Sequence, residues 1–181
     1  MKTKQTTIEV RGTAITVLSS RDDDFISLTD IARFKNADHP DDVVRNWLRN
    51  RNTVEFLGVW ERLYNPAFNP VEFDGIRIQA GLNSFTLTPK QWLEKTAAVG
   101  IVSRAGRYGG TFAHKDIAFE FASWVSVEFH QLLVLANIEG MNAEFIHMTL
   151  SQSDRLVRLN QVAIRQMQIL AASSTPRLLK P

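Results

Sequence analysis

The side chains that could perform catalysis or hold a metal are few and scattered in this chain of 181 residues. Cysteine is absent, which excludes a disulfide framework, a thiolate nucleophile and a cysteine-based metal site. The run Asp22 to Asp24 offers three carboxylates, but side chains alternate between faces in an extended segment, so we interpret the run as a solvated turn. His114 and Asp116 stand at the start of an expected helix, where capping by Asp116 explains them better than a metal or general-base role.

The remaining histidines and the glycine-rich segment form no catalytic motif. His39, His130 and His147 each lack a second histidine three or four residues away, and no nucleophile elbow, Walker A loop or dinucleotide fingerprint is present. Residues 104–110 are glycine-rich but lie between two expected strands, whereas a phosphate-cradling loop joins a strand to a helix. We therefore predict that the protein is not an enzyme and uses neither a metal nor a cofactor.

The distribution of charge is more informative than the net charge of +2. Residues 90–115 carry five Lys or Arg and one Glu, residues 116–150 carry five acids and no Lys or Arg, and residues 151–181 carry five bases and one acid. A nearly neutral chain with one basic segment can present a face that binds phosphates. Ordinary solvated surface charge explains the same pattern, and composition does not decide between them.

The first third of the chain is expected to form a β-hairpin, a short strand and three helices. Apolar and polar residues alternate on both sides of Arg11-Gly12, which predicts a hairpin, and Phe25-Ile26 closes a short strand. Capping residues and prolines mark the helix starts. Helices are expected from a capping box at 27–30 to about Asn36, from Pro40, and from a cap at Thr53 to just before Pro66.

The rest of the chain is expected to contain two hairpins and further helices. Apolar residues alternate on both sides of Asp74-Gly75, from Val71 to Ile78, which predicts a hairpin there. Thr88-Pro89 is expected to open a helix that runs to about Ala98, and a glycine-rich hairpin is expected between Ile101-Val102 and Thr111-Phe112. A further helix is expected from about Lys115. Helical structure is then expected over 128–172 with a break at Gly140, followed by an unstructured tail over 173–181.

The helix over 88–98 and the basic hairpin that follows it predict a DNA-binding surface. A helix can enter the major groove, while a hairpin beside it can place Arg against the backbone or minor groove. Lys90, Gln91 and Lys95 lie on polar faces of the helix, and the hairpin supplies Arg104 and Arg107 among glycines that permit close approach. An ordinary surface hairpin is the alternative.

Several runs of residues resemble KilA-N domains, which are found in large DNA viruses, phages and bacteria. The runs occur in family order over roughly residues 5 to 135, and the last is the most specific, although Val127 stands where proline is expected. They are 26–32 (ISLTDIA), Asn46-Trp47, 53–61 (TVEFLGVWE), Asn65-Pro66, 85–92 (FTLTPKQW) and 106–124 (GRYGGTFAHKDIAFEFASW).

This resemblance implies an α+β fold similar to the fungal APSES DNA-binding domain, a winged helix-turn-helix variant. It identifies 88–98 as the recognition helix and 103–110 as the wing, and it makes 45–84 look like an insertion relative to APSES domains. We therefore expect a DNA-binding domain over 1–135 and a helical extension with a disordered tail over 136–181. Residues expected to contact DNA are Lys90, Gln91, Lys95, Ser103, Arg104, Arg107, Tyr108 and Lys115, with Arg45, Arg49 and Arg51 as additional backbone contacts.

The expected role is that of a phage-type or bacterial regulatory protein that binds double-stranded DNA in the cytoplasm, on the nucleoid. No apolar stretch follows the N-terminal Met-Lys-Thr-Lys, so neither a signal peptide nor a membrane span is expected. Two alternatives stay open: an antirepressor-like interaction module that acts through its C-terminal helices, and an enzyme whose site the sequence does not reveal. The apolar stripe of those helices, Leu156, Leu159, Val162, Met167 and Leu170, indicates either homodimerisation or packing back onto the domain. Four tryptophans, Trp47, Trp60, Trp92 and Trp124, are expected to be buried.

Overall fold

The structure, a computed structural model, divides the chain into two compact units, Met1–Leu133 and Val134–Pro181. The boundary expected from the sequence falls between residues 135 and 136. Each unit is described by itself below. The structure describes residues 4–10, 12–19, 24–104, 106, 109–126, 134, 136, 138–139, 141–143, 145–146, 148, 150–159 and 161.

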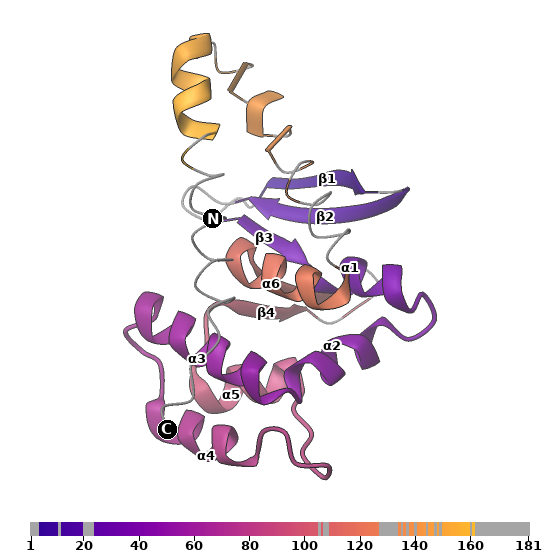
Figure 1. Cartoon of the computed structure of the whole chain (residues 1–181), viewed down its shortest axis with the longest axis vertical. Helices are drawn as coiled ribbons and strands as arrows, with labels where there is room; N and C mark the ends of the chain where they lie inside the picture. Colours follow the sequence, from indigo (N-terminus) through magenta and orange to yellow (C-terminus); the bar gives the residue numbers. More distant parts are fainter. Residues whose placement is uncertain are drawn as a thin grey trace, which may run out of the picture. The chain divides into compact units, whose positions relative to one another are not determined.

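A five-stranded antiparallel sheet in the order β1-β2-β3-β5-β4 forms the framework of the first unit (Figure 1). β1 (Lys4–Val10) and β2 (Thr13–Ser19) make the predicted hairpin, and Gly12 in its turn has a φ of 74°, which favours glycine. β3 (Asp24–Ser27) follows β2. β5 (Gly110–His114) then pairs with β3 on one side and with β4 (Ile101–Arg104) on the other, so the predicted second hairpin joins the same sheet.

Two helices of the first unit pack on the sheet, and the other four continue from the first of these in sequence order. α1 (Leu28–Lys35) and α6 (Lys115–Val125) contact the sheet and each other. Successive contacts then lead from α1 to α2 (Pro40–Leu48), α3 (Arg51–Tyr64), α4 (Pro70–Gln79) and α5 (Pro89–Thr96), and α5 returns to contact β4. Figure 1 shows this second group of helices beyond α1 and α6. The fold is therefore α+β, as the sequence predicts.

Local capping explains where several helices begin. The Ser27 hydroxyl accepts a hydrogen bond from the backbone N–H of Asp30 at 3.1 Å, and Asp30 lies in the first turn of α1, where its charge suits the helix dipole. Pro40 occupies the first turn of α2. The backbone N–H groups of a first turn have no partner within the helix, so the N–H that proline lacks is not needed there. Both starts agree with the sequence prediction.

The hairpin predicted around Asp74-Gly75 is wrong, because this segment is α4. The Asn69 carboxamide accepts hydrogen bonds from the N–H groups of Val71 and Glu72, and Pro70 occupies the first turn, so the helix start is well capped. Of the four apolar residues that suggested a hairpin, the first and the last face solvent. The middle two are separated by three positions, as on one face of a helix, and are buried. The exposed pair is Val71 (77%) and Ile78 (71%), and the buried pair is Phe73 and Ile76.

Three smaller expectations also need correction. α3 begins at Arg51 after Asn50, so Thr53 is a buried residue of its first turn and not its cap. α6 is capped by His114, whose Nδ1 accepts a hydrogen bond from the Asp116 N–H at 3.3 Å, and Asp116 is itself buried. Trp124 is only half-buried.

The other three tryptophans form part of the core, as predicted. Trp47 and Trp92 are fully buried and Trp60 nearly so. Trp47 packs edge-on against Phe121, with ring centroids 5.0 Å apart, which joins α2 to α6. Deleting such a ring typically costs about 3–5 kcal/mol, so these contacts supply a large part of the stability of a small domain.

In the second unit the described residues include a helical segment over residues 152–159. Ser151 begins it, because its hydroxyl accepts a hydrogen bond from the Asp154 N–H at 3.2 Å. Leu156 is 53% exposed, whereas Val162, Met167 and Leu170 of the predicted stripe lie outside the described residues. A search of the described residues finds no helix long and apolar enough to span a membrane.

Candidate nucleic-acid interface

The predicted recognition helix corresponds to α5, which is shorter than expected. It spans Pro89–Thr96, and Ala97 ends it with a left-handed φ of 53°. Its start is a full capping box: the Gln91 side chain accepts from the Thr88 N–H at 3.0 Å, and the Thr88 hydroxyl accepts from the Gln91 N–H at 3.2 Å. Trp92 and Thr96 are buried, while its exposed residues include Lys90, Gln91, Glu94 and Lys95.

α4 supports α5 through an aromatic cluster. The Phe73 ring meets the Trp92 ring edge-on with centroids 6.2 Å apart, and Phe68 contacts both rings. Gly58 lets α3 come close to α4, because a Cβ there would overlap the Phe73 ring. The element missed in the sequence analysis is therefore the one that packs directly behind the predicted recognition helix.

Two side chains fix the junction between α5 and β4: Glu61 of α3 and Asn65, the residue that caps the C-terminal end of α3. The buried Glu61 carboxylate accepts hydrogen bonds from the N–H groups of Val99 (3.0 Å) and Gly100 (2.8 Å). The Asn65 carboxamide donates to Glu61 at 2.8 Å and to the Ala97 carbonyl at 2.8 Å. This Glu61–Asn65 pair connects α3 to the turn that leads from α5 into β4, so it fixes the helix relative to the hairpin.

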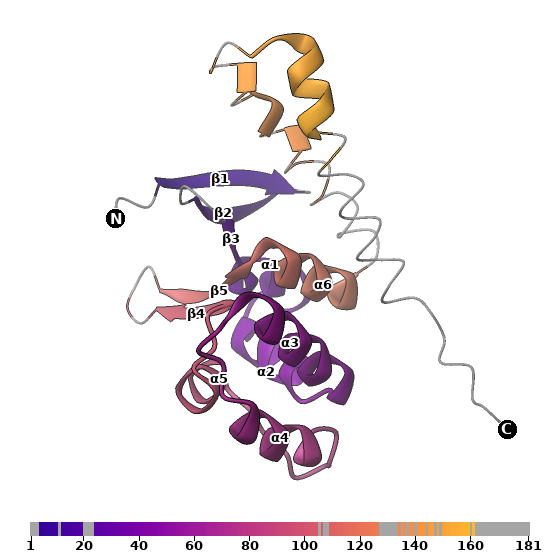
Figure 2. The ribbon, with the colours of Figure 1, turned by 90° about the vertical axis from the view of Figure 1, so that its left-hand side faces the viewer.

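The β4–β5 hairpin lies on the same side of the first unit as α5 (Figure 2). Arg104 pairs with Gly110 at the last described position before the tip. Gly110 approaches Thr29, whose hydroxyl accepts a hydrogen bond from the Thr111 N–H at 2.9 Å, so α1 supports the base of the tip. The predicted contacts Arg107 and Tyr108 lie outside the described residues.

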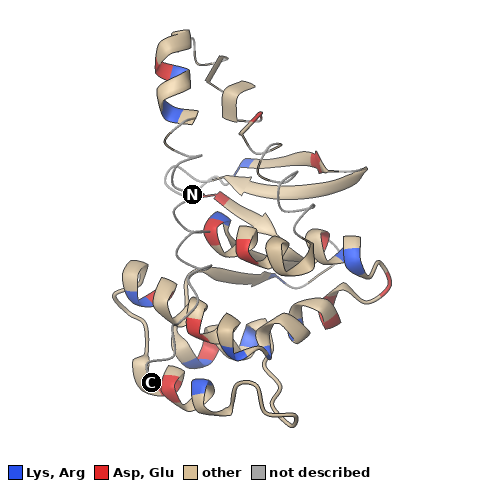
Figure 3. Cartoon of the chain, viewed as in Figure 1, with Lys and Arg blue, Asp and Glu red and all other residues tan. Residues whose placement is uncertain are grey.

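Ion pairs divide the predicted DNA-contacting cations into two groups. Lys90 pairs with Glu94 at 3.7 Å, Arg51 with Glu55 at 3.1 Å, and Arg45 with Asp42. Figure 3 shows this alternation of basic and acidic residues along the helices. Among the residues that the structure describes, four predicted cations have no ion pair: Arg49, Lys95, Arg104 and Lys115.

The structure brings some of the predicted residues together and separates others. Ser103 and Arg104 are exposed on β4, next to α5. Lys115 follows the other end of β5, about 13–17 Å along the strand from the tip. Arg49 lies at the C-terminal end of α2.

Sequence reasoning missed a polar groove beside α5. A cavity of about 160 Å³ is lined by Gln91 and Lys95 together with residues of α4 and of the loop before α5. Its polar lining also includes Gln79, Ser84 and Thr86. No sequence pattern marked these positions, because the groove depends on α4 being a helix.

The described residues contain no group of three or more His, Cys, Asp or Glu side chains placed to hold a metal ion. The side chains around α5 and the hairpin are instead hydrogen-bond donors and cations, which suit phosphate oxygens and base edges.

Comparison with known proteins gives one match. The family model for the KilA-N domain matches residues 9–139, which is most of the chain. No curated protein and no solved structure matches it. KilA-N is a family of DNA-binding domains. The match covers four of the five strands in full, all six helices named above and the α5–hairpin surface, and it begins near the end of β1. The chain therefore belongs to the KilA-N domain family.

Proposed function

We propose that the protein binds double-stranded DNA with α5 in the major groove and the β4–β5 hairpin as a wing along the backbone. The observation that carries this proposal is the fixed connection between the two elements: Glu61 and Asn65 bind the backbone of the turn that joins them. A helix and a wing must reach a groove and a backbone simultaneously, so a rigid angle between them favours binding. In this reading α4 and α5 are the two helices of a winged helix-turn-helix.

Phosphate contacts are assigned to the cations that no carboxylate neutralises. Among the described residues these include Lys95, Arg104 and Lys115. Arg107 and Tyr108, which lie outside the described residues, are proposed as further contacts together with Ser103. Lys90 contributes less, because Glu94 lies 3.7 Å from its ammonium group. Arg49 remains a candidate backbone contact, whereas Arg45 and Arg51 are engaged by neighbouring acids.

Gln91 is the proposed reader of a base edge, since a carboxamide can pair with N6 and N7 of adenine. Its oxygen already accepts from Thr88 in the capping box. Bidentate reading therefore requires the side chain to leave the cap, while its amide group can donate a single hydrogen bond without doing so.

The test is a double charge reversal in the wing, Arg104→Glu with Arg107→Glu. Affinity for several unrelated duplexes should fall to a similar extent, because phosphate contacts carry no sequence information. The slope of log affinity against log salt should be near −4 for the parent, at about −0.9 per phosphate contact, and shallower for the variant.

The matched control is Arg155→Glu with Arg158→Glu, which removes the same charge from the second unit. It should leave the affinity for a duplex with a single half-site unchanged, because binding to such a duplex does not need a second copy of the protein. Unchanged binding by the folded wing variant at low salt would show that the basic segment is only solvated surface.

The regulatory setting proposed is transcription control of the phage or bacterial type, with the protein on the nucleoid. A second copy would add a half-site and increase affinity. The exposed Leu156 and Val157 of the second unit favour this homodimer, since they are apolar and more than half exposed. Light scattering at micromolar concentration should give a dimer, and deletion of residues 140–181 should give a monomer. A monomer in both cases excludes dimerisation.

The same exposed residues favour a second candidate function, in which the second unit binds another protein as an antirepressor does. The two functions differ in one measurement. If the protein is an antirepressor-type module, the parent and the variant with Arg104→Glu and Arg107→Glu should bind duplex DNA with the same affinity.

A further inference from the structure

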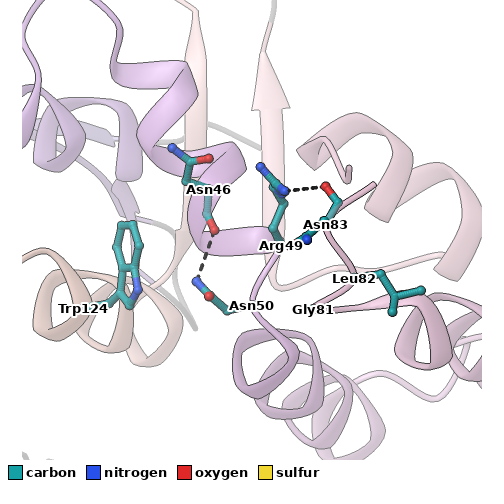
Figure 4. Close-up of a pocket in the computed structure, with 7 residues that line it drawn as sticks. All are labelled: Asn46, Arg49, Asn50, Gly81, Leu82, Asn83 and Trp124. Atoms are coloured by element: carbon teal, nitrogen blue, oxygen red, sulfur yellow. Dashed lines mark hydrogen bonds between the residues drawn. The ribbon is translucent and has the colours of Figure 1, made fainter. Parts of the chain in front are cut away.

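A second cavity lies outside the α5–hairpin surface, where α2 ends and α3 begins. It has a volume of about 330 Å³ and is lined by residues from α2, from the α4–α5 loop and from α6 (Figure 4). This volume is at the lower end of the range of small-molecule sites, about 300–1,000 Å³. The lining residues are Asn46, Arg49, Asn50, Gly81, Leu82, Asn83 and Trp124.

No carboxylate lines this cavity, and most of its polar groups can donate hydrogen bonds. Arg49 has no ion-pair partner among the residues described, and one of its guanidinium nitrogens donates to the Asn83 carbonyl at 2.9 Å. A guanidinium carries five N–H donors, so others remain for a ligand. The side chains of Asn46 and Asn83 are exposed and have no described hydrogen bond. An anionic oxygen ligand fits this lining better than a cation.

The aromatic wall of the cavity indicates what else the ligand contains. Trp124 is half-buried, stacks on Phe121 with centroids 6.1 Å apart, and carries the Lys35 ammonium group 4.1 Å from its ring centroid. Lys35 lies over this ring but is not one of the residues that line the cavity. Indole rings pack against nucleic-acid bases, and asparagine carboxamides pair with base edges.

We propose that this cavity binds a single nucleotide, with its phosphate on Arg49 and its base between Trp124 and the Asn46 carboxamide. An inorganic phosphate alone would satisfy the cation but leave the aromatic wall and most of the volume unused. The nucleotide can come from two sources, a free mononucleotide or an unpaired nucleotide of a DNA strand. This site goes beyond duplex binding by α5 and the wing, and its test is separate.

The first test is a titration with deoxyadenosine monophosphate followed by NMR. The Trp124 indole N–H signal, assigned by its loss in Trp124→Phe, should shift saturably. Inorganic phosphate at the same concentrations should shift it at least about tenfold more weakly, since it lacks the base. An equal response to phosphate would overturn the proposal, because the cavity would then be a simple anion site.

The variants are Asn46→Asp and Asn83→Asp, which place a carboxylate in the cavity at exposed positions without described side-chain hydrogen bonds. Each should weaken nucleotide binding about tenfold or more, because the added carboxylate repels the phosphate. Gln5→Glu on β1 makes the same charge change outside the cavity and should bind as the parent does. Arg49 is not used here, because its guanidinium donates to the Asn83 carbonyl and its replacement would disturb the loop.

A second arm compares a blunt duplex with the same duplex carrying a single-stranded overhang. If DNA is the source, the Asp variants should weaken binding of the overhang duplex more than that of the blunt duplex. If the free nucleotide is the source, only the NMR titration should respond. If neither nucleotide binding nor overhang-duplex binding is weakened in the two Asp variants, the site is excluded. The wing reversal tests blunt-duplex binding independently.

Discussion

Glu61 and Gly100 are joined by a hydrogen bond of 2.8 Å between a buried carboxylate oxygen and a backbone N–H that directly precedes β4. The carboxylate also accepts from Val99, so one side chain of α3 satisfies two consecutive main-chain donors. A Cβ at Gly100 would overlap Trp60 and Ile117, which shows how closely this turn lies against the core. The relative position of α5 and the β4–β5 hairpin thus depends on a side chain that is not part of either element.

Glu61→Gln should destabilise the fold, because a carboxamide presents an NH₂ group to donors that need an acceptor. Leaving buried donors unsatisfied costs about 1–3 kcal/mol each, so we expect a loss of about 2–4 kcal/mol in chemical denaturation. Glu55→Gln is the matched control on α3, since its carboxylate makes a surface ion pair and should matter by less than about 1 kcal/mol. Equal effects of the two substitutions would contradict the assigned role of Glu61.

Gly58→Ala and Gly75→Ala should have opposite effects on stability. At Gly58 the added methyl overlaps the Phe73 ring, and overpacking typically costs about 1–3 kcal/mol. Around Gly75 no atom lies within 4 Å of an added Cβ, so alanine should stabilise α4 by about 0.5–1 kcal/mol through its better helix propensity. Thermal unfolding of both variants checks this pair, and a destabilising Gly75→Ala would argue against α4 being a helix.

Glu120→Gln should stabilise the protein at neutral pH. Burial raises the pKa of Glu120 above its ordinary value of 4.5, while a hydrogen bond from Trp47 Nε1 at 3.3 Å opposes the shift. Because the pKa is higher in the folded state, ionisation of Glu120 opposes folding. This cost is absent below pH 4.5 and fully present once the pH exceeds the folded-state pKa.

The measurement is the free energy of unfolding of the parent and of Glu120→Gln across this pH range. The amide can still accept from Trp47, so the main change is the removal of a buried charge. The difference between the two proteins should shrink as the pH falls. A difference that does not vary with pH would mean that the charge is not responsible.

Gln91→Glu and Gln91→Ala separate helix capping from base reading. Glutamate at this position preserves the capping box with Thr88 but removes the amide donor, whereas alanine removes both. Only Gln91→Ala should lower stability, by about 0.5–2 kcal/mol. Both should reduce discrimination between two duplexes that differ in one A·T pair by about 1–3 kcal/mol. Discrimination is the ratio of the affinities for the two duplexes, so the uniform effect of the added charge cancels. Intact discrimination in both variants would show that Gln91 does not read the base edge.

The sequence predicted the elements whose signals are local. Gly12, Ser27, Pro40 and Thr88 each act within a few residues, through a turn conformation or a cap, and all four mark the boundaries expected. α4 was mistaken because Val71, Phe73, Ile76 and Ile78 satisfy a strand pattern and a helix pattern equally. The decision came from the Asn69 cap and from packing against Trp92, which lies on another helix.

The candidate site could be predicted only in part, because its support is non-local. Charge and glycine placement indicate α5 and the hairpin, which adjoin in the fold. The two backbone N–H groups that donate to Glu61 lie 38 and 39 residues further along the chain, so no local pattern links them to it. Lys90 has an ion-pair partner, whereas Lys95 has none among the described residues. This difference depends on side-chain positions, which the net charge of a segment does not reveal.

The position of β5 between β3 and β4 also determines how the domain can fold. Ile26 must find Ala113, and the intervening chain contains α1 to α5, so this pairing closes a long loop. The helices between them form largely local contacts and can develop first, whereas the β4–β5 hairpin joins the rest of the sheet only when β5 reaches β3. During synthesis the β4–β5 hairpin would therefore join the sheet late, after most of the helices have formed, and until then β3 would present an open edge to other chains.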